Sequence, residues 1–398
     1  MIKISHIKYF FFIPSFYGFV TILFTYLIFL LDVIDYNPIS FSSHFIIIFS
    51  IFSFFISTIL YYNLNKIFIL NFNVTKVKID SGILIILYSI GYLGVYLYLD
   101  EYFSYYGGYL NYFLVLFSDT SSELRSNGQI ASESIGIQLT YAGWIAIGIT
   151  FFHLINNRIS KLWMIPLIIT FICNLFFIDR TRPMWILLIV LYILFCSIQK
   201  RIKLSRLLIS SFISIFSFLL IFIFIGNIAG KTTEVKQYKG WDISPNAQNI
   251  VFYLTSSYVY LDYIINNENP QYEFDRTINP ALKLLKAVGL TEKEPSSRIN
   301  EFYGNPYQTN VGTFLEPFYR DFGFLFMLFA VFIHSIILNH VAFYFLKLGT
   351  PYSLFLVSNI CIIDFFSFFT PKLNNFPIWF FFSLGFMIVI KKMFLRNG

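Results

Sequence analysis

Charged residues are scarce in this chain of 398 residues. Asp, Glu, Lys and Arg together make up only 12% of it, whereas 57% of the residues are hydrophobic and the mean hydropathy is +0.69. A soluble domain carries about 25% charged residues, because charge must cover its surface. The composition therefore excludes an ordinary soluble protein and predicts an all-α polytopic membrane protein.

Histidine and cysteine are also rare, with five and three residues. Cys173, Cys196 and Cys361 all lie in apolar runs and have no zinc-type spacing, so we expect buried thiols without a disulfide. The sequence also lacks a glycine-rich phosphate loop, a nucleophile elbow and an acidic metal cluster. We therefore expect no metal, no cofactor and no nucleotide chemistry on the cytoplasmic side.

Long apolar runs, by contrast, are abundant. A membrane-spanning helix needs roughly 17–25 apolar residues. About ten segments reach or approach this length: 10–31, 43–62, 81–99, 137–155, 162–178, 184–199, 207–229, 322–346, 352–370 and 377–390. The first run is too long for the core of a signal peptide, and no small-residue cleavage site follows it, so we interpret it as a span.

The basic residues indicate how these helices are oriented. With both termini in the cytoplasm, the inner segments hold 15 of the 28 Lys and Arg residues and a single acid, Asp80. Cytoplasmic loops collect basic residues, and the inverted orientation places the cluster from Lys200 to Arg206 outside. The net charge of +7 therefore marks the cytoplasmic face and does not indicate a nucleic-acid partner.

Only one polar stretch is long enough to form a domain-sized loop. We expect seven transmembrane helices in residues 1–229 with an outer loop at 100–136, a large extracytoplasmic loop at 230–321, and three helices with a cytoplasmic C-terminus in 322–398. The large loop has 9 basic and 11 acidic residues. Apolar spacings of three and four predict helices inside it at 249–265 and 280–288, with Pro280 at a first helical position. The apolar piece 109–117 is too short to span.

The first candidate site is the turn Asp179-Arg180-Thr181-Arg182-Pro183, between two predicted spans. Arginine at a membrane is costly unless it is hydrated or paired, so two of them indicate function. Pro183 disfavours helix at Arg182, and residues two apart share a side of an extended chain, which allows both guanidinium groups to clamp one phosphate. The alternative is interfacial snorkelling with Asp179 as the ion-pair partner.

A second candidate site ends the large loop, just before the eighth predicted span. It comprises Asn310, Thr313, Glu316, Tyr319, Arg320 and Asp321. The large loop contains no histidine, so a carboxylate must accept any substrate proton there, most simply Glu316 or Asp321. Helix capping explains Asp321 without any function but leaves Arg320 and Glu316 unexplained.

Three further arginines are weaker candidates. Arg276 and Arg298 lie in the body of the large loop, each with carboxylates nearby in sequence, and Arg125 lies in the first outer loop. Such charge groups are usually a solvated surface.

Asp364 is a candidate because it falls within the ninth predicted span, although pairing with Lys372 or with an arginine of the first candidate site also accounts for it.

The order of these segments resembles the Wzy-type oligosaccharide repeat-unit polymerases of bacterial surface polysaccharides. The resemblance rests on the Asp-Arg-Thr-Arg-Pro turn, a basic inner loop, a span, and a large outer loop with three motifs: Tyr258-Val259-Tyr260-Leu261-Asp262, Asn310-Val311-Gly312-Thr313-Phe314 and Tyr319-Arg320-Asp321-Phe322-Gly323. The likeness covers about residues 177–338, and the first half of the chain matches only in hydropathy. The chain departs from this type at Phe324 to Phe326, where a second glycine often follows.

The resemblance implies a membrane glycosyltransferase (GT-C-like) architecture, similar to that of the O-antigen ligases, in the bacterial inner membrane. It implies a metal-independent inverting or retaining transfer at the outer face: the growing glycan leaves undecaprenyl diphosphate and joins a lipid-linked repeat unit. Undecaprenyl-diphosphate-linked oligosaccharides, membrane lipid, a flippase and a chain-length regulator are the implied partners. We expect Arg180, Arg182, Arg320, Arg298 and Arg276 at the diphosphate, Asp321 or Glu316 as the base, and Arg125, Asn310, Thr313 and Tyr319 at the substrate.

Two other functions are compatible with the sequence. One is an O-antigen ligase or a related lipid-linked glycan transferase of the same architecture. The other is a flippase or transporter of lipid-linked oligosaccharides. Transporters tend to show two halves with matching spans. The two halves of this chain do not match, and a large one-sided loop has no evident use in transport, so the polymerase is the favoured hypothesis.

Overall fold

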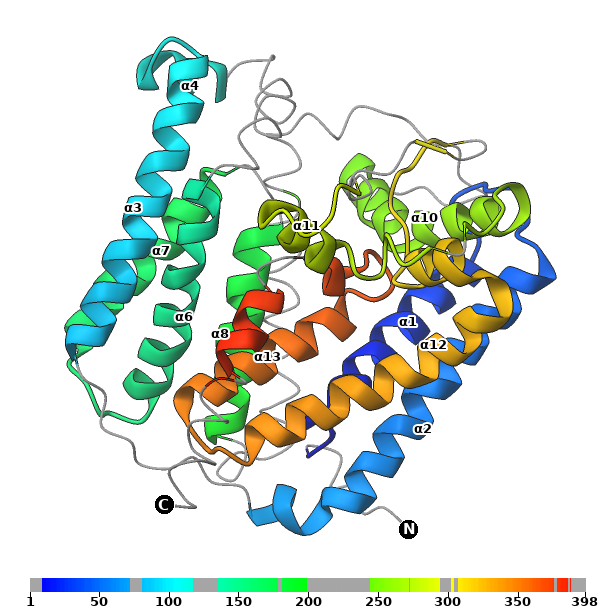
Figure 1. Cartoon of the computed structure of the whole chain (residues 1–398), viewed down its shortest axis with the longest axis horizontal. Helices are drawn as coiled ribbons and strands as arrows, with labels where there is room; N and C mark the ends of the chain where they lie inside the picture. The colour runs from blue at the N-terminus through cyan, green and yellow to red at the C-terminus, as the bar shows by residue number, and fades with distance from the viewer. Residues whose placement is uncertain are drawn as a thin grey trace. The chain divides into compact units, whose positions relative to one another are not determined.

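The computed structural model describes residues 9–71, 81–116, 135–177, 181–198, 223, 244–271, 273–293, 302–303, 307–375, 378–385 and 387. Helices make up the regular structure of these residues (Figure 1). No strand occurs among them beyond isolated bridges such as the one between Tyr303 and Thr309. The prediction of an all-α fold is therefore confirmed.

The chain folds into two compact units. The first combines Met1–Phe72, Val235–Leu348 and Asn359–Gly398, and the second combines Asn73–Glu234 with Gly349–Ser358. The three-part division expected from the sequence follows the order of the chain, whereas these units group segments that are distant in sequence. In particular, most of the large loop belongs to the same unit as the first two helices.

The first unit is built around α1 (Pro14–Leu30), α2 (Phe41–Asn71), α10 (Pro245–Asn267) and α12 (Leu315–Leu346), with the short α11 (Asn279–Ala287) beside them. Helix α10 comes from the large loop, yet it packs against α1, α2 and α12. Tyr258, Tyr260 and Leu261 of α10 are fully buried in this core. The hydroxyls of Tyr258 and Thr25 lie 2.6 Å apart, which ties α10 to α1.

The Asp262 side chain of α10 is hydrogen-bonded to residues at the beginning of α2. Its Oδ1 accepts hydrogen bonds from the backbone N–H of Ser40 at 2.7 Å, the Ser40 hydroxyl at 2.6 Å and the Ser43 hydroxyl at 2.8 Å. The first N–H groups of a helix lack intrahelical partners, and a carboxylate at this end also complements the helix dipole. The motif that contains Asp262 therefore joins the large loop to a predicted membrane helix.

The second unit contains α3 (Ser81–Tyr105), α4 (Tyr109–Leu116), α6 (Ile135–Ile155), α7 (Met164–Leu175) and α8 (Thr181–Ile198). Among the described helices, α3 and α6 have the most extensive contact with each other. Glycines allow their backbones to approach closely, since a Cβ added to Gly94 would lie 2.6 Å from the carbonyl oxygen of Gly136. Close approach at small residues is typical of helix pairs in membranes.

Helix α12 contains a sharp kink at Gly323, whose φ is 77° and ψ is −179°. This backbone region is essentially restricted to glycine. As a result the short first segment, 315–322, lies beside the longer second one: the ring centroids of Phe318 and His334 are 6.1 Å apart. The predicted eighth span, 322–346, begins at this kink, and the segment before it carries the second candidate site.

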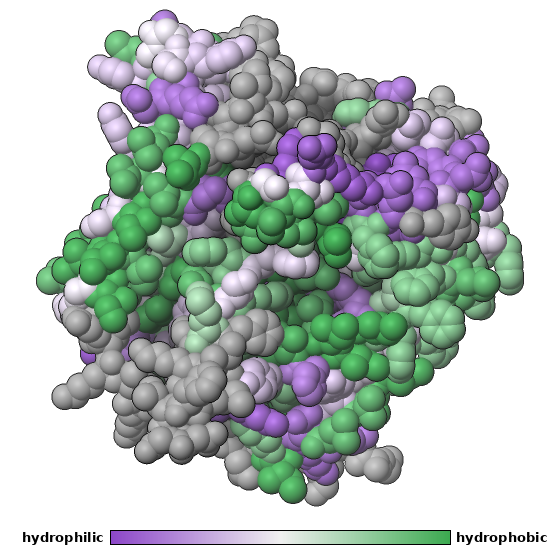
Figure 2. Space-filling model, in the orientation of Figure 1, coloured by the Kyte–Doolittle hydropathy of each residue, from purple (hydrophilic) through white to green (hydrophobic). Residues whose placement is uncertain are grey.

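Within the part of the chain that the structure describes, four helices are long and apolar enough to cross a membrane: Phe41–Ile69, Ser81–Tyr105, Ile135–Ile155 and Leu315–Leu346. Four shorter apolar helices are Pro14–Leu30, Lys161–Leu175, Thr181–Ser197 and Pro351–Phe365, the last of which is α13. Hydrophobic side chains cover the outward side of α3, and hydrophilic ones gather at its α4 end (Figure 2). These features fit a multi-pass membrane protein.

Eight of the ten predicted spans coincide with these helices. The predicted span 207–229 lies outside the described residues apart from residue 223, and 377–390 is described, as helix, at 378–385 and 387. The helices predicted in the large loop at 249–265 and 280–288 are confirmed as α10 and α11, with Pro280 in the first turn of α11. The apolar piece 109–117 contains the short helix α4.

Candidate functional site

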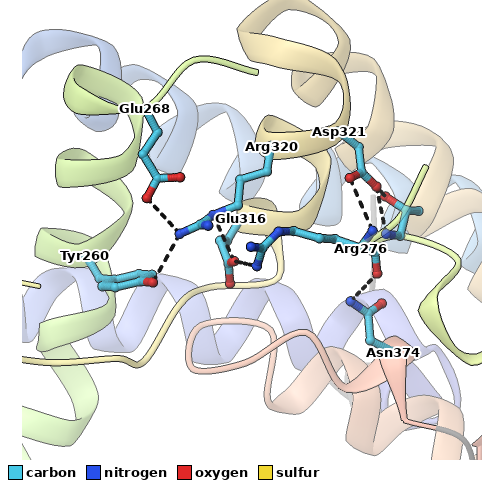
Figure 3. A network of polar contacts seen from close by, with 8 residues as sticks. Tyr260, Glu268, Arg276, Glu316, Arg320, Asp321 and Asn374 are labelled. Atoms are coloured by element: carbon cyan, nitrogen blue, oxygen red, sulfur yellow. Dashed lines mark hydrogen bonds and ion pairs between the residues drawn. The ribbon is translucent and has the colours of Figure 1, made fainter. Parts of the chain in front are cut away.

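Two arginines converge on one buried carboxylate at the beginning of α12 (Figure 3). Glu316 lies in the first turn of this helix, and Arg320 follows one turn later. The Nε of Arg320 is 3.2 Å from Glu316 Oε1, and the Nη1 of Arg276, from the loop before α11, is 3.3 Å from the same oxygen. The Glu316 side chain is only 3% exposed, so this oxygen carries two charge-assisted contacts in a region of low dielectric constant.

The far side of Arg320 meets the end of α10. Its Nη2 lies 2.9 Å from Glu268 Oε1 and donates to the Tyr260 hydroxyl at 3.2 Å. Burial, together with the carboxylate of Glu316, raises the pKa of Tyr260, so this hydroxyl stays protonated at neutral pH. We call Tyr260, Glu268, Arg276, Glu316 and Arg320 the arginine cluster; its two guanidinium groups face two carboxylates, which balances its formal charge.

Asp321 lies next to the arginine cluster, but its carboxylate binds backbone groups and the Thr277 side chain. Its Oδ1 accepts from the backbone N–H of Arg276 at 3.2 Å, and its Oδ2 accepts from the N–H and the hydroxyl of Thr277 at 2.7 and 2.5 Å. Asn374 donates to the carbonyl oxygen of Arg276 at 2.7 Å. The alternative explanation, in which Asp321 caps its own helix, is therefore wrong: its carboxylate accepts hydrogen bonds from N–H groups of another segment and so positions Arg276.

The other residues predicted at the end of the loop also make inward contacts. Thr313 is buried, and its hydroxyl accepts from the N–H of Leu315 at the beginning of α12. The hydroxyl of Tyr319 donates to the carbonyl oxygens of Ile265 and Glu268, both at 3.0 Å. Asn310 is half-buried. Thr313 and Tyr319 thus support the backbone around the arginine cluster.

The partners of Arg276 differ from those that sequence proximity suggested. Glu273 and Asp275 are its neighbours in the chain, but both pair with Lys293, at 2.6 and 2.7 Å. These hydrogen bonds raise the pKa of Lys293. The carboxylate that Arg276 contacts belongs to Glu316, forty residues further on.

Arg182 lies in the second unit and is not part of an extended turn. Helix α8 begins at Thr181, so Arg182 and Pro183 occupy its first turn. The expectation of an extended turn is wrong because proline is tolerated in the first turn of a helix, where its missing N–H has no intrahelical partner to lose. Asp179 and Arg180 fall outside the described residues, as do Arg125 and Arg298.

The Arg182 side chain is held by aromatic rings. Its guanidinium donates to the Thr140 hydroxyl at 3.0 Å and to the Tyr141 hydroxyl at 3.4 Å, and the residue is 7% exposed. Its terminal carbon lies over the rings of Phe177, Tyr141 and Trp144, at 4.5, 5.3 and 5.8 Å from their centroids. Each such contact is worth about 0.5–2 kcal/mol. Arg182 is therefore buried between helices and does not snorkel.

Asp364 pairs with a histidine. Its Oδ1 lies 3.1 Å from Nε2 of His334, and both residues are buried in the first unit. The suggested pairing with Lys372 is wrong: the ammonium group of Lys372 lies 5.4 Å from the centroid of the Phe366 ring. On the same helix as His334, the hydroxyls of Ser335 and Ser57 are 2.7 Å apart. These polar contacts join α12 to its neighbours, as interhelical hydrogen bonds do in membranes.

Sequence reasoning missed Glu268, Tyr260 and Thr277. Tyr260 belongs to a motif that the resemblance brought out, but no pattern linked it to an arginine sixty residues away. Glu268 follows the last residue of α10 and was one of eleven acids in the loop. Its proximity to Arg320 depends on how α10 packs against α12, which residue spacing does not encode.

The thiols and metal-type ligands form no further site in the described part of the chain. Cys173, Cys196 and Cys361 are free; Cys196 and Cys361 are buried as predicted, whereas Cys173 is half-buried. No three His, Cys, Asp or Glu side chains gather in a group that could hold a metal ion in the residues described. No protein-family model matches the chain, and neither a curated protein nor a solved structure is significantly similar to it.

Proposed function

We propose that this protein is a polysaccharide polymerase of the bacterial inner membrane. It transfers a growing glycan from undecaprenyl diphosphate onto a lipid-linked repeat unit at the outer face. The proposal includes ten membrane spans, cytoplasmic termini and a GT-C-like architecture. It also includes a flippase and a chain-length regulator as partners. Its support is the sequence resemblance, the set of apolar helices, and a charged cluster where the large loop meets α12.

The observation that carries the proposal is the convergence of Arg276 and Arg320 on Glu316. In the proposed reaction an acceptor hydroxyl attacks the anomeric carbon, the bond from that carbon to the diphosphate oxygen breaks, and the diphosphate departs with the electron pair. Negative charge therefore develops on the leaving group. Preorganised guanidinium groups stabilise such charge strongly in a poorly hydrated site, and their planar forks suit phosphate oxygens.

The acceptor hydroxyl must lose its proton to a base. Of the two carboxylates expected from the sequence, Asp321 is engaged by the backbone of Arg276 and Thr277. Glu316 is the one that contacts the arginine side chains, so we assign the role of base to Glu316. The proton then passes from the acceptor oxygen to the Glu316 carboxylate as the new glycosidic bond forms. Arg180, Arg125 and Arg298 stay predictions, because no described residue tests them.

Genetic complementation tests this proposal. A strain whose own copy is deleted is supplied with wild type, Arg320→Ala or Arg276→Ala, and its surface polysaccharide is separated on a gel. We expect the ladder of long chains to collapse to single repeats for either variant. Lys293→Ala is the matched control, since it removes a cation of the same loop whose ion pairs with described residues are those to Glu273 and Asp275.

Membrane levels of each variant are compared by immunoblotting, so that a poorly expressed protein is not mistaken for an inactive one. A wild-type ladder from both arginine variants contradicts the role of the arginine cluster. Full-length polymer that accumulates on its lipid carrier in the deletion strain contradicts polymerisation itself and identifies a ligase.

A further inference from the structure

The arginine cluster already contains carboxylates that contact Arg320. Two guanidinium groups, of Arg276 and Arg320, face the carboxylates of Glu316 and Glu268. An anionic ligand that approaches these four groups meets no net positive charge. Attraction of a diphosphate to this site therefore requires that one carboxylate move away.

The two carboxylates differ in how easily they can move. Glu316 is 3% exposed and is shared by both arginines, so its removal would strand two buried cations. The Glu268 side chain is 25% exposed and, among the described residues, makes a single ion pair, to Arg320. The release of such a partly exposed pair costs little.

The backbone around Glu268 also permits this movement. Helix α10 ends at Asn267, and Glu268 has an extended conformation with φ −110° and ψ 140°. Its carbonyl oxygen, not its side chain, accepts the hydrogen bond from Tyr319. The carboxylate can thus rotate into water while the fold stays fixed. Figure 3 shows Glu268 and Glu316 on opposite sides of the Arg320 guanidinium.

We propose that Glu268 is an internal competitor that occupies the Arg320 anion site, gives way to the diphosphate of the substrate, and returns to expel the diphosphate product. This inference rests on the proposed function. It makes Glu268 a positioning residue: it touches Arg320 and not the reacting atoms. A polymerase that must discard a diphosphate at each cycle gains faster release, because the returning carboxylate replaces the departing anion at Arg320.

Binding of inorganic diphosphate to the purified full-length protein in lipid nanodiscs tests this inference by calorimetry. The variant Glu268→Gln keeps the size and hydrogen-bonding atoms of the side chain but loses its charge. We expect it to tighten diphosphate binding by about two- to fivefold, the factor that corresponds to the loss of one partly exposed ion pair. Glu273→Gln, which removes a charge from the Lys293 pair in the same loop, should leave the dissociation constant unchanged.

Two further arms separate direct competition from general repulsion. In an Arg320→Ala background, Glu268→Gln should no longer tighten binding, because there is no contact left to compete for. With lipid-linked substrate, Glu268→Gln should lower both KM and kcat, since the product then leaves more slowly. A simple structural role would not lower KM.

The inference is overturned if Glu268→Gln binds diphosphate no more tightly than wild type, or if neither protein binds it. It is also overturned if the tightening persists in the Arg320→Ala background, which would indicate long-range repulsion only. A failure here is distinguishable from failure of the proposed function. If Arg320→Ala abolishes long polymer while Glu268→Gln leaves diphosphate binding unchanged, the proposed polymerase function is supported. Only the role of Glu268 as an internal competitor is then rejected.

Discussion

Arg276 and Glu316 form an ion pair of 3.3 Å between the turn before α11 and the first turn of α12. The two residues are forty positions apart, and the pair joins the polar loop to an apolar helix. The Glu316 side chain is almost completely buried, whereas that of Arg276 is 19% exposed. A buried carboxylate needs partners for its charge. The pair therefore fixes the position of the loop as well as that of the cations.

Substitution of Glu316 should separate its structural role from its chemical one. Glu316→Ala leaves two guanidinium groups without their shared acceptor, and we expect a loss of about 3 kcal/mol in the free energy of unfolding, the scale for one removed partner of a buried pair. Glu316→Gln keeps an acceptor oxygen, so its loss should be smaller. Thermal and chemical unfolding in detergent micelles measure both values.

The same pair of variants identifies the base. If Glu316 accepts the substrate proton, Glu316→Gln should fold yet make only single repeats on the polysaccharide gel. If Glu316 only holds the arginines, a well-folded Glu316→Gln protein should still produce a ladder. Asp321→Asn is the comparison, because Asp321 binds backbone groups of the loop. A full ladder from Glu316→Gln would refute the assignment of Glu316 as the base.

Arg182 should stabilise the second unit through its planar guanidinium. Arg182→Lys keeps the charge but loses the fork that reaches the Thr140 hydroxyl and lies over three rings. We expect both Arg182→Lys and Arg182→Ala to be destabilised, the latter by about 2 kcal/mol. Arg158→Lys provides a control, since within the described residues the guanidinium of Arg158 lies over a single ring, that of Phe152. Equal unfolding temperatures for wild type and Arg182→Lys would contradict a role for the stacked fork.

Asp262 should be required for the attachment of α10 to α2. Asp262→Ala removes the single oxygen that accepts from Ser40 and Ser43, and we expect a loss of about 1–2 kcal/mol, as for a lost helix cap. Asp262→Asn retains an acceptor oxygen and should therefore keep most of the stability that Asp262→Ala loses. Limited proteolysis is the second readout, since a loosened α10 exposes the large loop to cleavage. Unchanged cleavage in Asp262→Ala would show that the core around Tyr258 suffices to hold the helix.

Periodicity and apolar length predicted most of the helices, including α10 and α11 inside the polar loop. These signals are local, and each depends on a few consecutive turns. Pro280 lies in the first turn of α11, one residue later than the first helical position that was predicted. The prediction of an extended turn at Arg182 was wrong because two local rules conflict at Pro183. Proline disfavours helix at the preceding residue, yet it is accepted in the first turn of a helix. Sequence alone does not decide which rule applies.

The arginine cluster was predictable only in part. Glu316 and Arg320 are one helical turn apart, so their proximity follows from the sequence. Arg276 and Glu268 reach them from other segments, through the packing of α10 and the backbone contacts of Asp321. Glu273 and Asp275 are close to Arg276 in sequence, but both carboxylates pair with Lys293, which sequence proximity did not indicate.

Gly323 offers a test of how the kink in α12 positions the cluster. Its φ of 77° with ψ of −179° is a conformation that a Cβ makes costly, by about 1–3 kcal/mol. Gly323→Ala should therefore be destabilised by this amount, and the segment that carries Glu316 and Arg320 should lose its alignment with Arg276. We expect shortened polysaccharide chains together with a lower unfolding temperature. Leu325→Ala, at a residue 74% exposed on the same helix, should change neither. Wild-type stability in Gly323→Ala would mean that α12 can straighten without cost, in which case the kink does not place the cluster.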